Sequence, residues 1–502
     1  MNKNKILLDY IYDKRWCSFK NEISSDLIED IVLEAKSFDN EKKFFIIGKA
    51  IIKNALPQYF IMPLTSEKIE NEVPLKYKGH EYYDALKSKS YWSSLMTEIA
   101  LDKGFVFSNG FKLIYQSWDG FDFITKHIDD ISKPLNAEQS NSTIIVGDNI
   151  FAFKQQRMIE FTKDANPEVE MNYNLMKTGC RVVPKTYGHL SLINTTGESA
   201  FVGIIQEFVP NNGDLWELSR EKLLSILSEA FSSQSDIITL PKYKKLSELM
   251  HLVGHETEKL ISCLSSFSGD KSLISKPVTL SYIREYKSEL KKLMLETKDN
   301  IKNNINKLSS DMALNIQEIL QNWEKYISKF LNEKFNKISN RKDRGLLMRV
   351  HGDFHLGQAI ESKSGAIKFI DFSGEPNLDF SARKEKRSYM YDIAGMYRSI
   401  SGYLPVVVTK RFATDENGTI NNEKLLWANS TIKPVIKNLS DAFLSEVDID
   451  KDWLEIEIFR RNLYEINYEI AYRPQMLFIP IDNLKALLLS TQESNPKVQK
   501  RK

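Results

Sequence analysis

At 502 residues, 42% of them hydrophobic, the chain is long enough for two or three domains with apolar cores, and its composition excludes a disordered or fibrous protein. Its formal net charge of +2 is too small to favour nucleic acid as the main partner. No segment sustains the run of about eighteen apolar residues that a membrane helix needs, so we expect a cytoplasmic protein that binds neither membrane nor nucleic acid.

Three regions follow one another along the chain. Residues 1–105 mix short β-rich runs, such as KFFIIGKAII and YFIMPLT, with one helical stretch that ends at a glycine. Strand patterns dominate 106–209, with one helical span, NPEVEMNYNLMKTG, and they end at PNNGD, whose composition indicates a loop. Helical periodicity prevails over 210–502 and is clearest from Tyr282 to Leu331, which we expect to form a solvated helical hairpin.

One stretch of the helical region, RVHGDFHLGQAIESKSGAIKFIDFSGEP, concentrates polar side chains between apolar runs. If LLMRV and AIKFIDF are short buried strands, HGDFHLGQ is the loop after the first and Asp371 lies at the end of the second. Asp353 and Gln358 are separated by the offset that a protein-kinase catalytic loop places between its base aspartate and its metal-binding asparagine. Phosphoryl transfer needs such a carboxylate and oxygen ligands for Mg²⁺, so the pattern predicts a kinase site. HGD alone is equally compatible with a loop capped by an aspartate.

A kinase site also requires groups that hold nucleotide phosphates, and the β-rich region offers them in the expected order. Lys154 closes a strand, and the following helix carries Glu168 and Glu170, either of which could pair with the lysine. Small polar residues that can donate hydrogen bonds to phosphate precede Lys154 in EQSNSTIIVGDNIFAFK. The stretch GIIQEFVPNNGD then resembles the strand and hinge that join two kinase lobes and bind adenine.

Together these motifs resemble the maltokinases, aminoglycoside-phosphotransferase-like kinases that make maltose 1-phosphate from maltose and ATP. The resemblance runs almost from end to end of the chain. The matching stretches are KRWCSFKN, YYDALKS, EQSNSTIIVGD, FKQQR with NPEVE, QEFVPNNGD, RVHGDFHLGQ, FIDFSGEP, YDIAGMYRS, and YEINYEIAYRP with IPI. HGD-x-HLGQ combined with IDF-x-GEP is far more restrictive than the general kinase pattern.

The resemblance implies an α+β chain with a bilobal, eukaryotic-protein-kinase-like fold of the aminoglycoside phosphotransferase type. Residues 1–105 would form an N-terminal cap subdomain. Residues 106–209 would form a β-rich intermediate region or N-lobe with the phosphate loop. Residues 210–502 would form a large helical C-lobe that carries the catalytic loop and the sugar site.

The resemblance also implies a role for each matching residue. Asp353 is the expected catalytic base, and Gln358 and Asp371 are the expected magnesium ligands. Lys154 with Glu170 is expected to position the phosphates of ATP. The expected phosphate loop and adenine contact comprise Gln139, Ser140, Asn141, Ser142 and Thr143, and Gln206, Glu207, Phe208 and Val209. Glu375 would order the loop after the metal ligand, or else be a glutamate of a surface turn.

A sugar acceptor needs hydrogen-bonding side chains and an aromatic face, and EINYEIAYRP supplies both at spacings that share a helix face. The expected acceptor residues are Asp353, His355, Arg398, Tyr468, Glu469, Tyr472 and Arg473. The same segment is also compatible with an amphipathic helix whose charges are exposed. Arg460 and Arg461 precede it where maltokinases usually have Asp and Lys.

The predicted function is ATP- and Mg²⁺-dependent phosphorylation of maltose to maltose 1-phosphate, which would feed α-glucan (glycogen) synthesis. The partner is then a small-molecule sugar. A separate trehalose synthase or maltosyltransferase would be its functional neighbour, because we expect no fused trehalose synthase domain. One alternative is a glucosamine or other aminosugar kinase of the same fold. Another is an inert pseudokinase scaffold, which is disfavoured because Lys154, Asp353, Gln358 and Asp371 are all present.

Overall fold

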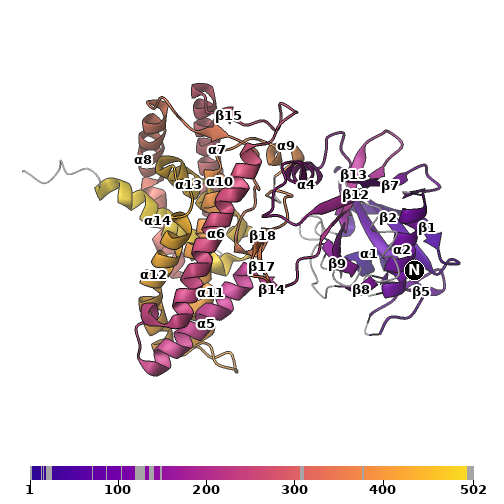
Figure 1. Ribbon diagram of the computed structural model, residues 1–502, viewed down its shortest axis with the longest axis horizontal. Helices are drawn as coiled ribbons and strands as arrows, with labels where there is room; N and C mark the ends of the chain where they lie inside the picture. Colours follow the sequence, from indigo (N-terminus) through magenta and orange to yellow (C-terminus); the bar gives the residue numbers. More distant parts are fainter. Residues whose placement is uncertain are drawn as a thin grey trace, which may run out of the picture. The chain divides into compact units, whose positions relative to one another are not determined.

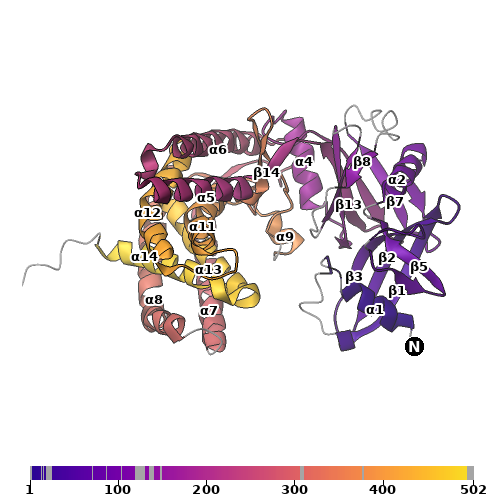
Figure 2. The same cartoon turned by 90° about the horizontal axis from the view of Figure 1, so that it is seen from below.

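The computed structural model describes residues 3–12, 14, 16–17, 25–70, 72–85, 88–102, 104–118, 131–134, 141–146, 150–305, 310–375 and 378–493. The chain divides into two compact units, which are described separately here. The first comprises Met1–Lys177 and Val183–Pro210, and the second comprises Thr178–Val182 and Asn211–Lys502. Figure 1 and Figure 2 show β-strands throughout the first unit and mainly helices in the second.

The first unit contains two antiparallel sheets. One has the strand order β1-β2-β3-β5-β4, and β11 also pairs with β3. Its strands are β1 (Ile28–Phe38), β2 (Lys43–Ile52), β3 (Gln58–Thr65), β4 (Leu75–Tyr77), β5 (His80–Asp84) and β11 (Met158–Ile159). Helix α1 (Lys3–Tyr12) buries Leu7 and Ile11 in an apolar cluster with Ile46 and Phe60 of this sheet. We did not expect β1, because IEDIVLEAKSF mixes charged and apolar residues without clear alternation.

The other sheet has the strand order β6-β7-β12-β13-β10-β9-β8. Its strands are β6 (Gly104–Val106), β7 (Lys112–Ser117), β8 (Ile131–Pro134), β9 (Asn141–Val146), β10 (Phe151–Gln156), β12 (Thr186–Ile193) and β13 (Ser199–Glu207). One apolar cluster joins Phe45 and Ile47 of the first sheet to Phe153 and Leu190 of the second, with Trp92 from α2 (Lys89–Asp102). Burial of this shared apolar surface stabilises the unit. Helix α4 (Pro167–Lys177) packs against β12.

The second unit is mainly helical, and its long helices are amphipathic or fully buried. They are α5 (Leu215–Ser233), α6 (Pro241–Ser265), α7 (Leu280–Asn304), α8 (Ser310–Ser339), α10 (Met390–Arg398), α11 (Leu404–Ala413), α12 (Asn422–Leu444), α13 (Lys451–Tyr472) and α14 (Phe478–Glu493). Helix α13 is central, since it packs against α7, α8, α10 and α14. None of the described helices is both long and apolar enough to cross a membrane.

The predicted helical hairpin is confirmed by the antiparallel pair α7 and α8 (Figure 1). Helix α7 buries Ile283, Tyr286, Leu290 and Met294, which recur at helical spacing, and leaves its Lys- and Glu-rich side in solvent. The hairpin therefore packs one face on the core of the unit, which explains its charged composition.

A small antiparallel sheet of the order β14-β17-β18 lies beside the helices of the second unit. Its strands are β14 (Asn211–Asp214), β17 (Ala359–Ser362) and β18 (Ile367–Phe369). The expected strand LLMRV is shorter in the structure, where β16 covers only Leu346–Leu347 and pairs with β15 (Lys276–Pro277). The expected strand AIKFIDF is likewise reduced to β18, because the chain turns at Asp371.

Candidate active site

Helix α10 holds the HGD turn in place. The carboxylate of Asp392 accepts hydrogen bonds from the backbone N–H groups of His351 (2.7 Å) and Gly352 (2.9 Å). Gly395, one turn later, lies so close to the loop that a Cβ there would be 2.4 Å from the carbonyl oxygen of Phe354. Both residues belong to YDIAGMYRS, so the role of this motif is to receive the loop that carries Asp353.

His351 links that loop to the strand end that carries Asp371. Its Nε2 lies 2.9 Å from the carbonyl oxygen of Ile370, and its Nδ1 accepts a hydrogen bond from the backbone N–H of Asp353 at 3.4 Å. This pattern corresponds to the tautomer with the proton on Nε2. A buried imidazole thus ties together the backbone on either side of the two candidate catalytic aspartates.

A guanidinium faces one oxygen of Asp353 and an imidazole faces the other. Arg461 Nη1 lies 3.6 Å from Oδ1, and His355 Nε2 lies 3.7 Å from Oδ2. Burial raises the pKa of Asp353, but the contact with His355 and the charge of Arg461 outweigh burial and hold the pKa below its ordinary value. Asp353 is therefore ionised at neutral pH, as a general base must be.

The two expected magnesium ligands lie side by side. Gln358 Nε2 is 3.5 Å from Asp371 Oδ2, and Ser373 Oγ donates to Asp371 Oδ1 at 3.0 Å. Asp371 has a φ of 66°, a left-handed conformation in which backbone strain often accompanies function. The described residues contain no cluster of three His, Cys, Asp or Glu side chains that could hold a metal ion. One amide and one carboxylate still fit Mg²⁺, which binds few protein ligands and keeps water and phosphate oxygens.

Glu375 of the GEP motif is 1% exposed, so the alternative of a surface-turn glutamate is wrong. Its carboxylate accepts a hydrogen bond from Tyr391 of α10 and lies 3.4 Å from Arg460 Nη1 of α13. The guanidinium of Arg460 also stacks on the ring of Tyr391, 3.8 Å from its centroid. Glu375 therefore anchors the loop that follows Asp371 to two helices of the second unit.

A pocket of about 320 Å³ opens beside Asp353, entirely within the second unit. It is lined by Trp216, Asp353, His355, Gly395, Ser399, Tyr403, Val407, Arg461, Tyr464, Glu465, Tyr468, Glu469, Arg473 and Met476. Four aromatic rings and several charged groups thus surround one ionised carboxylate. Aromatic faces combined with hydrogen-bonding side chains are what a sugar ring requires.

Guanidinium groups pair with every carboxylate among the lining residues. Glu465 accepts hydrogen bonds from Arg398 (2.6 and 3.1 Å) and from Arg461 (3.3 Å). Glu469 accepts two from Arg473, at 2.7 and 3.0 Å. With the contact between Arg461 and Asp353, the charges of this pocket are balanced.

The structure places five of the seven expected acceptor residues in the lining. These are Asp353, His355, Tyr468, Glu469 and Arg473. Arg398 is completely buried, Tyr472 is exposed, and neither is among the lining residues. Arg398 instead holds Glu465, and Tyr472 packs on the ring of Tyr468 at 4.9 Å.

Sequence reasoning missed several lining residues. Tyr464 and Glu465 lie one helical turn before Tyr468 and Glu469, so extending the same helix face backwards would have found them. Trp216 comes from the start of α5, and no sequence pattern ties it to α13. The same holds for Tyr403, which ends a π-helical turn over Ser399–Tyr403, a distortion frequent at functional sites.

The expected phosphate-binding pair lies in the first unit, with one correction. Lys154 Nζ lies 3.1 Å from Oε1 of Glu168, so the ion pair uses Glu168 where the sequence analysis assigned Glu170. Glu168 is 1% exposed. Residues 168, 171, 172 and 175 form the buried face of α4, which carries Glu168 towards the sheet.

The expected phosphate loop falls partly on a strand. Asn141, Ser142 and Thr143 belong to β9 and pair with β10, with Thr143 directly opposite Lys154. These three are therefore not a loop, because the β-branched run that follows them continues the sheet. Gln139 and Ser140 lie outside the described residues.

The expected adenine contact ends β13. The backbone N–H of Glu207 donates to the carbonyl oxygen of Lys185 (2.7 Å), and that of Phe208 donates to Ile150 (2.9 Å). The side chain of Gln206 donates to Asn172 and Thr186 within the same unit. Adenine binding by this stretch, including Val209, would therefore use groups other than these two N–H groups.

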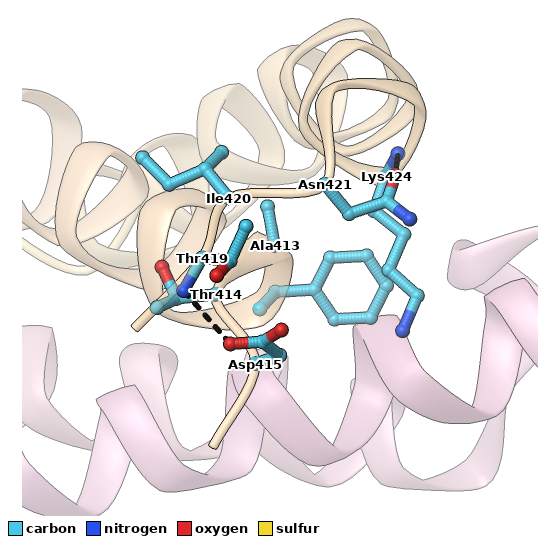
Figure 3. A pocket seen from close by; sticks show the side chains of 8 residues that line it. Ala413, Thr414, Asp415, Thr419, Ile420, Asn421 and Lys424 are labelled. Carbon is cyan, nitrogen blue, oxygen red and sulfur yellow. Dashed lines mark hydrogen bonds between the residues drawn. The ribbon is translucent and has the colours of Figure 1, made fainter. Parts of the chain in front are cut away.

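A second pocket, of about 340 Å³, lies where α11 ends and α12 begins (Figure 3). Its polar groups stabilise the turn itself. Asp415 Oδ1 accepts a hydrogen bond from the backbone N–H of Thr419 at 2.8 Å, and Asn421 caps α12 through the N–H of Lys424. We therefore assign it a structural role.

No family model matches the chain. Among solved structures, a glucosamine kinase in complex with glucosamine, ADP and inorganic phosphate aligns with a TM-score of 0.57 and 15% identity, over 93% of this chain and 95% of that chain. Its crystal form B aligns with a TM-score of 0.58 and 15% identity, over 94% and 97%. A spectinomycin phosphotransferase in its AMP-bound complex aligns with a TM-score of only 0.33. At these identities the likeness concerns the fold, and it confirms the predicted α+β, bilobal, kinase-like architecture.

Proposed function

We propose that this protein is an ATP- and Mg²⁺-dependent sugar kinase that converts maltose to maltose 1-phosphate. The observation that carries the proposal is the pocket beside Asp353, where aromatic side chains and paired charges surround an ionised carboxylate. The fold shared with glucosamine kinase over most of the chain supports phosphoryl transfer to a sugar hydroxyl. A separate trehalose synthase or maltosyltransferase would then be its functional neighbour.

Each candidate residue has a chemical role in this proposal. Asp353 orients the anomeric hydroxyl and accepts its proton while that oxygen bonds to the γ-phosphorus of ATP. The bond from the γ-phosphorus to the β,γ-bridging oxygen breaks, and ADP leaves. Lys154, held by Glu168, balances phosphate charge. Gln358 and Asp371 would hold Mg²⁺, which supplies further charge neutralisation when it is bound.

The length of the pocket favours an acceptor larger than one hexose. Its lining follows α13 from Arg461 to Arg473, a span of about 18 Å along an α-helix. Tyr464 and Tyr468 follow one another along this span, with their ring centroids 6.2 Å apart. A disaccharide can contact both side chains, whereas a monosaccharide with its hydroxyl at Asp353 would reach only the inner part.

The balance of charge favours a neutral acceptor. An aminosugar that carries an ammonium group gains most from a carboxylate that has no cation beside it. In this pocket Asp353, Glu465 and Glu469 each contact a guanidinium. The polar groups are thus arranged to exchange hydrogen bonds with hydroxyls of an uncharged sugar.

Phosphorylation of glucosamine or another aminosugar is the second candidate. It is favoured by the chain-long likeness to glucosamine kinase. Under this alternative the reacting group is a primary hydroxyl, and the same Asp353 accepts its proton. An inert scaffold is less favoured, because Asp353, Gln358 and Asp371 are assembled with the contacts described above.

The test is ATP-dependent phosphorylation with Mg²⁺ across maltose, glucose, glucosamine and an aminoglycoside, with the modified hydroxyl identified by NMR. We expect transfer to the anomeric oxygen of maltose. Transfer to glucosamine alone would establish the second candidate. No transfer to any of the four would contradict both.

Asp353→Asn removes the general base while preserving the shape of the side chain. We expect turnover to fall by roughly 10²- to 10⁴-fold, with ATP binding retained within a few-fold. Steady-state kinetics and calorimetric titration of ATP measure the two quantities. Near-normal turnover in this variant would show that Asp353 is not the base.

A further inference from the structure

Arg461 is the only α13 side chain within 4 Å of Asp353 among the described ion pairs, and sequence analysis gave it no role. Its guanidinium lies between two carboxylates, with Nη1 3.6 Å from Asp353 and Nε 3.3 Å from Glu465. The side chain is 13% exposed and lies over the ring of Tyr464, 4.9 Å from its centroid. Arg461 is therefore restrained on several sides while one of its amino groups faces the candidate base.

Glu465 restrains Arg461 because Arg398 holds Glu465 in place. Arg398, which is 0% exposed, binds one oxygen of Glu465 through two nitrogens, and Arg461 binds the other oxygen. Two guanidinium groups and two carboxylates thus alternate in the order Arg398, Glu465, Arg461 and Asp353. A charged pair that is already ordered loses little conformational entropy when substrate binds.

Besides Arg461, three charged or titratable groups face Asp353 or its loop, and they differ in their effect on its ionisation. His355 and His351 belong to the same loop, and both favour the ionised form of Asp353. Asp392 of α10 lies beneath the loop and opposes that form, as does burial. Arg461 is the permanently charged group in this set, since guanidinium does not lose its proton in proteins.

We propose that Arg461 is the positioning residue of the candidate base: its contact with Oδ1 holds Asp353 ionised, while Oδ2, which faces His355, receives the proton of the acceptor hydroxyl. This inference rests on the proposed sugar kinase activity. It assigns to Arg461 a function in catalysis that is exerted through Asp353 rather than by contact with ATP. A merely structural arginine would affect stability and leave the protonation of Asp353 unchanged.

The kinetic test is the pH dependence of kcat/KM for Arg461→Gln, Arg461→Lys and the wild type. In the wild type we expect no loss from base protonation down to the pH at which the protein unfolds. In Arg461→Gln we expect an acid limb to appear above that pH, because the charge of Arg461 no longer offsets the effect of burial. Arg461→Lys should restore most of the wild-type profile. Melting temperatures recorded at each pH separate loss of activity from unfolding.

Arg473→Gln is the matched control, since Arg473 lines the same pocket and pairs with Glu469 without contacting Asp353. It should raise KM for the acceptor and, like the wild type, show no acid limb above the pH of unfolding. If the pH profiles of kcat/KM for the wild type and Arg461→Gln had the same shape and differed only in height, the proposal would be overturned.

A direct titration needs no acceptor and keeps this inference separate from the proposed function. In protein labelled with ¹³C at aspartate side-chain carboxyls, the Asp353 signal is assigned as the one lost in Asp353→Asn. Its midpoint should move upward by at least one pH unit in Arg461→Gln, a tenfold change in proton affinity. An unmoved midpoint would overturn the role of Arg461, whereas inactivity of the wild type towards every sugar would overturn only the kinase proposal.

Discussion

Glu457 of α13 is a fully buried carboxyl that the proposed chemistry does not use. Both of its oxygens accept a hydrogen bond from Tyr286 of α7, at 2.8 and 2.9 Å, and Arg460 Nε lies 3.5 Å away. Burial nevertheless raises the pKa of Glu457 from 4.5 to about 7. The contact between the helical hairpin and the core therefore depends on the protonation of one side chain.

This raised pKa gives the stability of the protein a specific pH dependence. Below about pH 4.5 Glu457 is protonated in both the folded and the unfolded state, and its contribution is complete. Between 4.5 and about 7 only the unfolded state releases the proton, so the free energy of unfolding falls by up to about 3 kcal/mol. In Glu457→Gln we expect the free energy of unfolding, measured with urea at pH 5 and pH 8, not to show this decrease.

Glu285→Gln, a change at an exposed glutamate, should show the same decrease as the wild type. If the free energy of unfolding of Glu457→Gln depended on pH as it does in the wild type, Glu457 would not be the group responsible.

The choice between Glu168 and Glu170 shows how far sequence alone reaches at single residues. Both lie in the first turn of α4, and the order of strand, lysine and helix correctly located the acidic partner to within two positions. The phase of the helix decides between them, because Met171 and Leu175 are buried and share their face with Glu168. That phase was readable from NPEVEMNYNLM, whereas the resemblance to a family favoured the other residue.

At the scale of elements, the close approach of α10 to the HGD loop is a testable feature. A methyl group at Gly395 would lie 2.4 Å from the carbonyl oxygen of Phe354, so Gly395→Ala must push the loop away from the helix. Because Asp353 precedes Phe354, we expect kcat to fall by about 10²-fold, the effect of misplacing a catalytic group by about 1 Å. Steady-state kinetics and thermal melting measure both consequences.

Gly254→Ala provides a control in the same unit. Gly254 lies on α6, where an added Cβ would be 2.3 Å from the carbonyl oxygen of Phe443 on α12, and neither residue lines the pocket beside Asp353. Both variants should lose stability, while only Gly395→Ala should lose turnover beyond what its unfolded fraction explains. Equal losses of kcat in the two variants would show that the glycine at α10 serves packing alone.

The elements themselves were predicted unevenly, for physical reasons. The hairpin α7–α8 and strands such as β2 have strong periodicity or long apolar runs, and they appear in the structure. β17 was read as part of a loop because its four residues, AIES, carry no pattern of their own and are strand only through pairing with β14 and β18. The lining of the pocket beside Asp353 could not be predicted in full for the same reason, since Trp216 and Tyr403 reach it through tertiary packing alone.

At the scale of the whole molecule, the candidate groups separate by unit. The pair Lys154–Glu168 lies in the first unit, and every residue that lines the acceptor pocket lies in the second. The kinase-like fold was predictable because the motifs of both parts occur in one order along the chain. The pairing of charges along α13 was not predictable, since it depends on tertiary packing.

This separation predicts that nucleotide use and acceptor binding can be lost independently. Lys154→Met should abolish ATP turnover and the thermal stabilisation by ATP. The Kd for maltose should stay within about twofold, because Lys154 does not line the pocket beside Asp353 and a ligand stabilises a protein only through its own contacts. Tyr468→Ala should weaken the binding of maltose and retain the thermal stabilisation by ATP. Lys154→Met also removes the cation beside the buried carboxylate of Glu168, which lowers the free energy of unfolding by about 1 to 3 kcal/mol. Lys154→Met/Glu168→Gln should recover part of this stability without recovering turnover. Calorimetry and thermal melting report each quantity, and a tenfold weaker Kd for maltose in the double variant would mean that the acceptor site depends on the first unit.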